Sequence, residues 1–474
     1  MEKGDSYIDA IVDRVLERLT AGASGTRPAP STAGDGLFDT LDEAARAAAE
    51  AFRAFSALPL EARRRTVAAV RRAAVEGADE LSRLAVAETG MGRVEDKVRK
   101  NVLAAEKTPG PEILDPDAVT GDHGLTLTDR APYGVIGSIT PSTNPSETII
   151  HNGISMMAGG NAVVFNGHPG AKETTARTIV LLNRAIHDAG GPPFLFTAVR
   201  EPTIETAQAL MTHPGIRLLV VTGGPGVVAA AMRSGKRVVA AGPGNPPAVV
   251  DETADVERAG KDLVLGSSLD NNIICVDEKE VICVAAVADR LRDAMVRAGA
   301  HLLEPNRLEA LEKLVLAENA GPGRHGAPRK EWVGRDASRI LDALGVPAAG
   351  DPRIVLVETE PDHPFVWTEL LMPVIPLCRV PDVDAAIDLA VRVEQGFGHT
   401  ASMHSRNLDA LSRMARAVNT SIFVKNGPNY SGLGFGGEGH TSFTIASPTG
   451  EGLTDARTFT RPRRCVLVDR FRIV

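Results

Sequence analysis

A single thiol in a polar sequence context is the first candidate for chemistry. Cys275 follows the run Asp270-Asn-Asn-Ile-Ile and precedes Val-Asp-Glu-Lys279, after which an apolar, β-branched segment begins. A thiol at such a junction between a polar loop and a strand is reachable by substrate, and a lowered pKa would make it a nucleophile. A purely structural cysteine is the alternative reading. The other three cysteines stand in apolar contexts typical of strands: Cys283, Cys378 and Cys465.

A glycine-rich loop is the second candidate. Residues 221–227 read Val-Thr-Gly-Gly-Pro-Gly-Val, between an apolar run and a helical one. Glycines let a ligand approach the backbone, and the N–H groups at a helix start favour a phosphate. Pro225 suits the first helical turn because it has no N–H to leave unpaired. The spacing is not that of the standard dinucleotide fingerprint, so a phosphate site and a plain tight turn both remain open.

Other polar features carry weaker signals. Three more glycine-rich stretches occur at 241–247, 396–400 and 432–439, each compatible with a ligand or with simple loop geometry. Glu369 could accept a hydrogen bond from a ribose hydroxyl or be a surface carboxylate. The histidines are scattered, and the cysteines and histidines lack the spacing of a metal site. We therefore expect no bound metal.

Composition excludes several classes of protein. The length of 474 residues corresponds to roughly three domains, and the apolar fraction of 43% is enough for a large core. With 52 Lys and Arg against 60 Asp and Glu, the net charge of −8 argues against a partner that is nucleic acid or an anionic membrane. The apolar runs are far shorter than the ~20 residues of a spanning helix, and the N-terminus does not resemble a secretory signal. Four cysteines indicate reduced thiols in the cytosol.

The elements that must position these residues form an α/β pattern. Residues 41–107 read as helices, and short β-branched runs then alternate with helical stretches. The runs are 134–140, 162–165, 218–221 and 237–240, and the helical stretches are 147–157, 171–189, 204–212 and 227–234. This alternation predicts βαβ units and a parallel sheet. Residues 260–465 show a second α/β pattern.

The first residues form a separate unit in the sequence. Apolar residues at 8, 11, 12, 15, 16 and 19 follow one face of a helix, and residues 21–36 have the composition of a flexible linker. Such a short helix needs a surface on which to bury its apolar stripe. It either docks on a partner or packs on its own domain.

Taken together, these segments resemble the aldehyde dehydrogenase superfamily, in its CoA-acylating branch from bacterial propanediol and ethanolamine utilisation. Seven stretches match in family order: 131–145, 221–226, 241–250, 270–275, 368–373, 399–404 and 434–450. The resemblance implies a Rossmann-type nucleotide-binding domain, an α/β catalytic domain and a small β extension for oligomerisation. The expected divisions are an encapsulation helix at 1–20, a linker at 21–36, an NAD- and CoA-binding domain at 37–245 with 121–131 in the extension, a thiol domain at 246–440, and a return to the cofactor domain with an oligomerisation strand at 441–474.

The resemblance also assigns roles to single residues. Cys275 falls on the nucleophile, and Glu369 on the glutamate that binds the nicotinamide ribose. Counting from Pro141 without gaps, Thr143 occupies the position of the oxyanion asparagine and Asn144 lies one residue later, so the Cys275 N–H is the expected donor. The remaining cofactor-binding candidates are Pro141, His168, Thr222, Gly223, Gly224 and Gly226.

Two departures from the superfamily pattern carry meaning. Hydrolytic members have a glutamate that activates water, whereas residues 240–245 here read Ala-Ala-Gly-Pro-Gly-Asn, without a carboxylate. Without that base a thiol such as CoA can take over the attack on the thioester. The lysine that usually binds the adenosine ribose is absent as well, since Asn166-Gly-His-Pro-Gly170 follows the strand.

The implied reaction is the NAD-dependent oxidation of a short-chain aldehyde to its acyl-CoA. A thiolate attacks the carbonyl, hydride leaves to the nicotinamide, and CoA releases the acyl group from the resulting thioester. Two alternatives stay open, a hydrolytic enzyme that gives the free acid and a non-catalytic shell-associated protein with the same fold. Acetaldehyde, propionaldehyde and lactaldehyde are equally compatible with the sequence.

The resemblance finally predicts partners and a location. Members of this branch carry a short amphipathic peptide that docks on microcompartment shell proteins, and residues 1–20 fit that description. We expect a homo-oligomer, a dimer or a tetramer, in the bacterial cytoplasm and inside a microcompartment. Neither nucleic acid nor a membrane is an expected partner.

Overall fold

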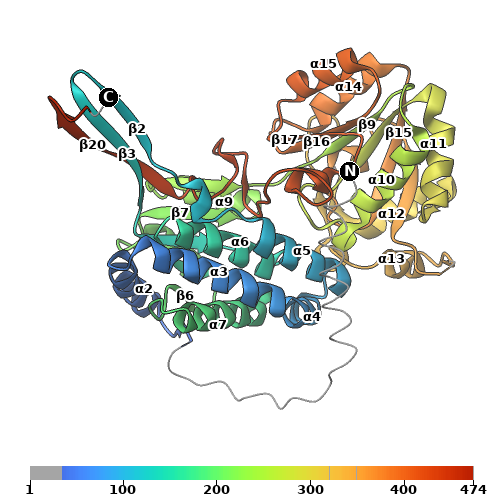
Figure 1. Ribbon diagram of the computed structural model, residues 1–474. Helices are drawn as coiled ribbons and strands as arrows, with labels where there is room; N and C mark the ends of the chain where they lie inside the picture. Colours follow the sequence, from blue (N-terminus) through green and yellow to red (C-terminus); the bar gives the residue numbers. More distant parts are fainter. Residues whose placement is uncertain (1–34, 320, 349, 473–474) are drawn as a thin grey trace. The chain divides into compact units, whose positions relative to one another are not determined.

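The computed structural model describes residues 35–472 except 320 and 349 (Figure 1). The predicted helix at 1–20 and most of the linker lie outside these residues. The described chain forms two compact units. Unit 1 contains the residues up to Glu88, Val98–Ala241 and those from His440 onward, and unit 2 contains Thr89–Lys97 and Gly242–Gly439.

Unit 1 is built on a parallel sheet of six strands, in the order β1-β6-β5-β4-β7-β8. The strands are β1 (Leu37–Phe38), β4 (Val135–Ile139), β5 (Ala162–Asn166), β6 (Phe196–Val199), β7 (Leu218–Thr222) and β8 (Val238–Ala241). Its helices are α2 (Leu41–Ser56), α3 (Leu60–Glu76), α4 (Ala78–Thr89), the greater part of α5 (Val94–Lys107), whose first residues up to Lys97 belong to unit 2, α6 (Pro145–Ala158), α7 (Lys172–Asp188), α8 (Ile204–Thr212) and α9 (Pro225–Met232). The predicted α/β class is confirmed, with α9 beginning two residues earlier than the sequence indicated.

The sequence determines these elements locally. Every residue of β4 and β5 is buried, as expected for central strands of a parallel sheet that helices cover on both faces. Helix α2 begins with a capping box, in which the Thr40 side chain accepts from the Glu43 N–H and the Glu43 carboxylate accepts from the Thr40 N–H. Because the strands are parallel, each connection from a strand to the following helix lies at the carboxyl edge of the sheet, where ligands of such folds bind.

Unit 2 contains a second parallel sheet, of seven strands in the order β11-β14-β15-β10-β9-β16-β17. The strands are β9 (Pro247–Val250), β10 (Glu280–Val284), β11 (Ala300–Leu302), β14 (Ile354–Thr359), β15 (Val374–Val380), β16 (Thr400–His404) and β17 (Ile422–Lys425). The helices are α10 (Val256–Ser268), α11 (Ala285–Arg297), α12 (Leu308–Val315), α13 (Ala337–Ala343), α14 (Val383–Val393) and α15 (Leu408–Val418). One apolar cluster joins the sheet to α10 and α11, and another joins it to α14 and α15.

A small antiparallel sheet extends from unit 1 (Figure 1). It consists of β2 (Asp117–Gly121), β3 (Gly124–Pro132) and β20 (Thr460–Val468), and β20 pairs with β3 along its whole length. Apolar side chains on it are exposed, Val466 to 58% and Val468 to 73%. Cys465, which the sequence grouped with the buried strand cysteines, is exposed here. That expectation is wrong because β20 belongs to a small antiparallel sheet on which most of its residues are exposed, and not to a parallel sheet covered by helices.

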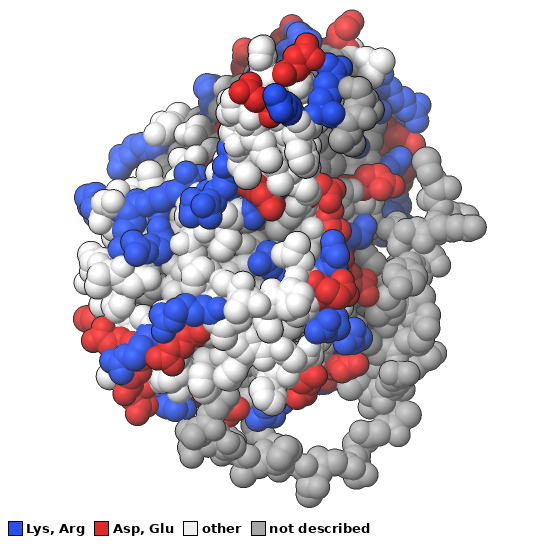
Figure 2. Space-filling model, turned by 60° about the vertical axis from the view of Figure 1, so that its left-hand side comes forward, with Lys and Arg blue, Asp and Glu red and all other residues white. Residues whose placement is uncertain are grey.

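The charged surface agrees with the small net charge of −8. In the view of Figure 2, basic side chains gather in one area and elsewhere lie among acidic ones. None of the helices in the described part of the chain combines the length and the apolar character that crossing a membrane requires.

Candidate active site

Cys275 lies on a tight turn between the short 3₁₀ helix Leu269–Asn272 and β10. Three successive residues before it adopt left-handed backbone angles, with φ of 48° at Asp270, 57° at Asn271 and 63° at Asn272. Asp and Asn tolerate this conformation better than other residues with a Cβ, which explains their use here. The thiol is half-buried, whereas Cys283 and Cys378 are buried within β10 and β15.

Other candidate residues of unit 2 lie at the same edge of its sheet, the edge where the strands begin. Cys275 precedes β10, Gly244 precedes β9, His399 precedes β16 and Glu369 precedes β15, and these four strands are neighbours in the sheet. A Cβ on Gly244 would lie 3.0 Å from the His399 ring, so the glycine is needed for close packing. The unit thus gathers a thiol, a carboxyl and an imidazole at the amino edge of its strands.

Burial shapes the protonation of this group. The pKa of the Cys275 thiol is raised to about 12, first because burial disfavours the thiolate and then because Glu369 carries negative charge nearby. The lowered thiol pKa that the sequence suggested is therefore not found. Burial also raises the pKa of Glu369 to about 7, against the opposing influence of Lys279 and of a backbone hydrogen bond from Gly244. The pKa of His399 is lowered to about 4, so its ring is neutral at pH 7.

Lys279 is a functional candidate that sequence reasoning missed. Only 2% of it is exposed, and its ammonium nitrogen donates to the Asn272 carbonyl oxygen at 2.8 Å, to Asn272 Oδ1 at 2.7 Å and to the Ile274 carbonyl oxygen at 3.0 Å. In the sequence it reads as a surface lysine within Asp277-Glu-Lys-Glu280. The available signal was that this charged run directly adjoins the apolar residues 281–284 of β10.

The segment that would hold a water-activating glutamate carries none. Asn245 is fully buried, and its amide nitrogen lies within hydrogen-bond distance of the carbonyl oxygens of Val366 at 3.1 Å and Val393 at 3.0 Å, as well as Glu280 Oε1 at 3.3 Å. These contacts tie the segment before β9 to β10, to the end of α14 and to the short 3₁₀ helix Pro364–Trp367. Asn245 is thus a structural residue, and 240–245 supplies no general base.

In unit 1, the glycine loop opens α9 as the sequence indicated. Gly224 is the N-cap and Pro225 is the first helical residue, and no described side chain caps this helix. Gly224 and Gly226 are exposed, and a Cβ on either would meet nothing within 4 Å. Thr222 Oγ1 lies 3.0 Å from Thr444 Oγ1 at the base of the loop. Open backbone at a helix N-terminus fits a phosphate, and so these residues fit a dinucleotide.

The segment after β4 contains the two oxyanion candidates. Asn144 is buried and is the N-cap of α6, and its Nδ2 donates to Thr143 Oγ1 at 3.2 Å. The ammonium group of Lys100 binds Asn144 Oδ1 at 2.5 Å and Glu147 Oε1 at 3.0 Å. Lys100 therefore fixes which end of the Asn144 amide can donate, a contact for which the sequence of α5 gave no signal.

The last two predicted residues also follow strand ends of unit 1. Pro141 is half-buried just after β4, and His168 is exposed just after β5. His168 Nδ1 accepts from the Gly170 N–H at 3.0 Å, which fixes the ring on the surface of the loop. Both lie at the carboxyl edge of the sheet; β4, which precedes Pro141, pairs with β7 and so neighbours the loop that opens α9, whereas β5, which precedes His168, lies one strand farther away.

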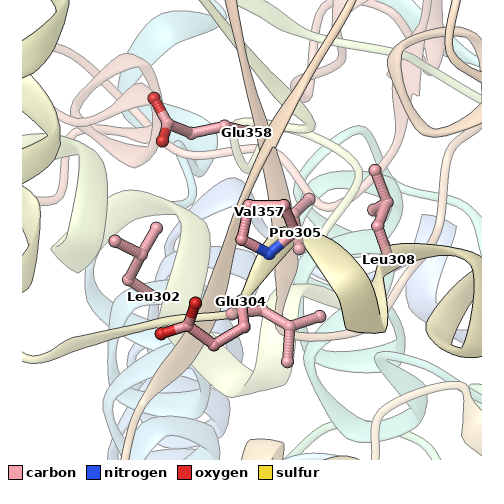
Figure 3. A pocket seen from close by; sticks show the side chains of 7 residues that line it. Leu302, Glu304, Pro305, Leu308, Val357 and Glu358 are labelled. Atoms are coloured by element: carbon pink, nitrogen blue, oxygen red, sulfur yellow. The ribbon is translucent and has the colours of Figure 1, made fainter.

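A cavity of about 50 Å³ in unit 2 contains none of these residues (Figure 3). Its lining is apolar apart from two carboxylates, and Glu358 Oε1 already accepts from Arg379 at 2.5 Å. The lining residues are Leu302, Leu303, Glu304, Pro305, Leu308, Val357 and Glu358. Within the described residues, no group of three or more His, Cys, Asp and Glu side chains is arranged to bind a metal.

Comparison with known proteins gives matches along the whole chain. The model of the aldehyde dehydrogenase family matches residues 32–309. The chain is 51% identical to acetaldehyde dehydrogenase (acetylating) EutE of Salmonella typhimurium, over 98% of this chain and 99% of that one.

Two solved structures are similar at the level of the backbone. One is a propionaldehyde dehydrogenase of Rhodopseudomonas palustris with bound CoA and an acylated cysteine, at 47% identity and a TM-score of 0.89, covering 92% of this chain and 98% of that one. The other comes from the fucose-utilisation microcompartment of Clostridium phytofermentans, at 44% identity and a TM-score of 0.89, covering 93% and 100%.

Proposed function

Because the chain belongs to the aldehyde dehydrogenase family and is a CoA-acylating member, which oxidises a short-chain aldehyde to its acyl-CoA through a cysteine thioester, we propose that Cys275 forms this thioester. The observation that carries the proposal is its placement. Cys275 is half-buried on a turn beside Glu369, while Cys283 and Cys378 are buried in strands. Cys465 lies on the small antiparallel sheet of unit 1.

In this proposal the Cys275 sulfur attacks the aldehyde carbonyl carbon, and the Cys275 N–H stabilises the resulting oxyanion. Of the two side-chain candidates in unit 1, Asn144 is the one whose amide nitrogen is fixed as the donor end, because Lys100 binds its oxygen. Since the thiol pKa is raised to about 12, the thiol must lose its proton when substrates bind.

The nucleotide loop and Glu369 hold the cofactor. The N–H groups at the start of α9 would bind the pyrophosphate, with Thr222, Gly223, Gly224 and Gly226 allowing close approach, and Pro141 and His168 follow the ends of β4 and β5. The Glu369 carboxylate would accept hydrogen bonds from the nicotinamide ribose. When bound, the nicotinamide would supply the hydride acceptor for the oxidation.

CoA rather than water accepts the acyl group. Residues 240–245 contain no carboxylate, and the Asn245 amide is engaged with backbone carbonyls and Glu280. A thiol is a better nucleophile than water toward a thioester and needs less help from a base. The acyl-CoA leaves as Cys275 regains its thiol.

We further propose that the protein works inside a bacterial microcompartment as a homo-oligomer. The relative from a fucose-utilisation microcompartment supports the location. The exposed apolar residues on β20 support pairing of subunits through the small antiparallel sheet. The apolar stripe of residues 1–20 supports docking on shell proteins.

The assignment of Cys275 is tested by substitution and product analysis. Cys275→Ala should lower NADH formation at least about 1,000-fold, because no covalent intermediate can form, while cofactor binding is retained. Cys283→Ala, which removes a buried thiol from β10, is the matched control. Without CoA the parent enzyme should give one fast turnover and then slow hydrolysis. Free acid formed at the full rate without CoA would contradict CoA as the acceptor.

The role of residues 1–20 is tested separately. Deleting the segment should leave turnover per subunit nearly unchanged and abolish co-purification with shell particles. Val15→Glu, which places a charge in the apolar stripe, should have the same effect as the deletion. A large fall in melting temperature with shell association intact would show instead that the helix packs on its own subunit.

A further inference from the structure

The turn that carries Cys275 is anchored from inside by one side chain. Asn272 is held in its left-handed conformation by hydrogen bonds from its Nδ2 to the carbonyl oxygens of Ser267 at 2.7 Å and Glu278 at 2.9 Å. With the amide fixed in this way, its Oδ1 points at the ammonium group of Lys279, 2.7 Å away. The turn therefore presents an already oriented acceptor to the lysine ammonium group.

All three donors of the Lys279 ammonium are engaged. Two go to Asn272, and the third goes to the Ile274 carbonyl oxygen at 3.0 Å, which also accepts from the Asp277 N–H at 3.1 Å. The main-chain N–H of Lys279 donates to the Pro246 carbonyl oxygen at 3.0 Å, which fixes the lysine to the residue just before β9. Hydrogen bonds from a charged donor in a dry site are short and strong, so this contact holds the turn firmly.

The Ile274 carbonyl belongs to the same planar peptide group as the Cys275 N–H. A cation bound to that carbonyl fixes the plane of the peptide and so the direction of the N–H. It also withdraws electrons from the amide, which makes the N–H a stronger donor to an oxyanion. One side chain thereby controls the orientation of the donor next to the thiol without touching the substrate.

Lys279 also supplies positive charge to a group of acids. Glu278 and Glu280 flank it and are fully buried, and the charges of Asp277 and Glu369 act on the thiol. Burial raises the pKa of Glu278 to about 8 and that of Glu280 well above its usual range, and Lys279 opposes both shifts. The lysine likewise favours the thiolate of Cys275, which Glu369 and Asp277 disfavour.

We propose that Lys279 is a positioning residue for the thiol: through the Ile274 carbonyl it orients the Cys275 N–H, and through its charge it supports the Cys275 thiolate. The proposal rests on Cys275 being the nucleophile. It distinguishes Lys279 from a lysine that only stabilises the fold, because it predicts a change in thiol reactivity and not just in stability.

The test is the pH profile of Cys275 alkylation by iodoacetamide, in a Cys465→Ser background that removes the exposed thiol. Lys279→Met should lower the alkylation rate at pH 8 about tenfold, because one unit of thiol pKa changes the thiolate fraction tenfold. It should also lower kcat with little change in the KM for the aldehyde, since the oxyanion forms only after binding.

Asn272→Gly is the matched control. Glycine accepts the left-handed angles, and the substitution removes an anchor of the turn while the ammonium stays near Ile274. Its alkylation profile should stay within about twofold of the parent although the protein is less stable. If Asn272→Gly shifts the profile as much as Lys279→Met, loop geometry and not the lysine controls the thiol, and the proposal is wrong.

Two further outcomes are distinguishable. An unchanged profile in a folded Lys279→Met protein overturns the role of Lys279 alone. Alkylation of Cys275 that leaves acyl-CoA formation intact in the parent contradicts the assignment of the nucleophile itself. If Lys279→Met does not fold, Lys279→Gln, which keeps a donor for the carbonyls but no charge, should show the same shift in the same measurement.

Discussion

The two parallel sheets place their candidate residues at opposite ends of their strands. In unit 1 the candidates follow β4, β5 and β7, at the carboxyl edge, and in unit 2 they precede β9, β10, β15 and β16, at the amino edge. At a carboxyl edge the following helices begin, so main-chain N–H groups are available for an anion. At an amino edge that resource is absent, and unit 2 uses buried side chains instead.

The difference predicts opposite responses to substitution. The nucleotide loop has open glycines and few side-chain contacts, so changes there should affect binding more than stability. The thiol edge depends on fully buried charged and polar groups such as Lys279, Glu280 and Asn245. Removing one partner from such a network leaves another unsatisfied, which is costly.

The largest expected effect is at the Lys97–Asp270 pair of unit 2. Both side chains are fully buried, 2.9 Å apart, and Asp270 Oδ1 also accepts from the Arg93 N–H at 2.8 Å. Lys97→Met should lower the free energy of unfolding by about 3–5 kcal/mol, because it leaves a buried carboxylate without its cation. Urea titration measures the loss. The double variant Lys97→Met/Asp270→Asn should recover most of it, and a loss below about 1 kcal/mol in the single variant would contradict the prediction.

The nucleotide loop should respond to charge without losing stability. Gly224→Asp introduces a good N-cap at φ −66° and ψ 168°, so the melting temperature should be unchanged or slightly raised. The carboxylate should repel the cofactor phosphates by about 2 kcal/mol, raising the cofactor KM roughly thirtyfold. Gly224→Asn caps without charge and should raise the KM much less. An equal rise in both variants would mean that bulk and not charge blocks the site.

Glu369 should couple cofactor binding to pH. Its pKa is raised to about 7, so the carboxylate forms, and the cofactor KM falls, as the pH rises through that value. Glu369→Gln should raise the KM about tenfold at pH 8, a loss of about 1.5 kcal/mol, and should remove this pH dependence. Steady-state kinetics between pH 6 and 9 provide the measurement. A variant that keeps the pH dependence of the parent would show that another group is responsible.

The smallest effect concerns a buried histidine of unit 1. His151 lies between Thr108 Oγ1 at 3.1 Å and Thr454 Oγ1 at 3.2 Å, and burial, reinforced by His440, lowers its pKa to about 3. A lowered histidine pKa stabilises the fold above about pH 6.5, and this contribution is lost as the pH falls toward 3. Between pH 6.5 and 5.5 the parent should therefore lose about 1 kcal/mol of stability through this histidine, and His151→Gln should not show this loss. Identical slopes of stability against pH would rule this out.

Much of the fold could be predicted because its signals are local. The strands at 135–139, 162–166 and 218–222 are short apolar runs between helical stretches, and Gly224 and Pro225 have the backbone preferences of a helix start. Cys275 stood out by its polar neighbours.

The buried charges could not be predicted, for a physical reason. Whether Lys279 or Lys97 is buried depends on strands and loops that other parts of the chain contribute, and each residue alone looks like an ordinary surface lysine. The raised pKa of the Cys275 thiol could not be predicted for the same reason, since Glu369 lies 94 positions away in the sequence yet acts on the sulfur. The exposure of Cys465 could not be predicted because the pattern of a strand does not reveal whether other elements cover its sheet.

The most direct test of the central claim is to trap the acyl-enzyme and locate it by peptide mass spectrometry. The protein is mixed with propionaldehyde and NAD in the absence of CoA, quenched in acid and digested. We expect one acyl group per chain, on the peptide that contains Cys275, and its transfer to CoA as propionyl-CoA when CoA is added before the quench. An acyl group on Cys465 or Cys283, or a Cys275→Ala variant that is acylated to the same extent, would contradict the account.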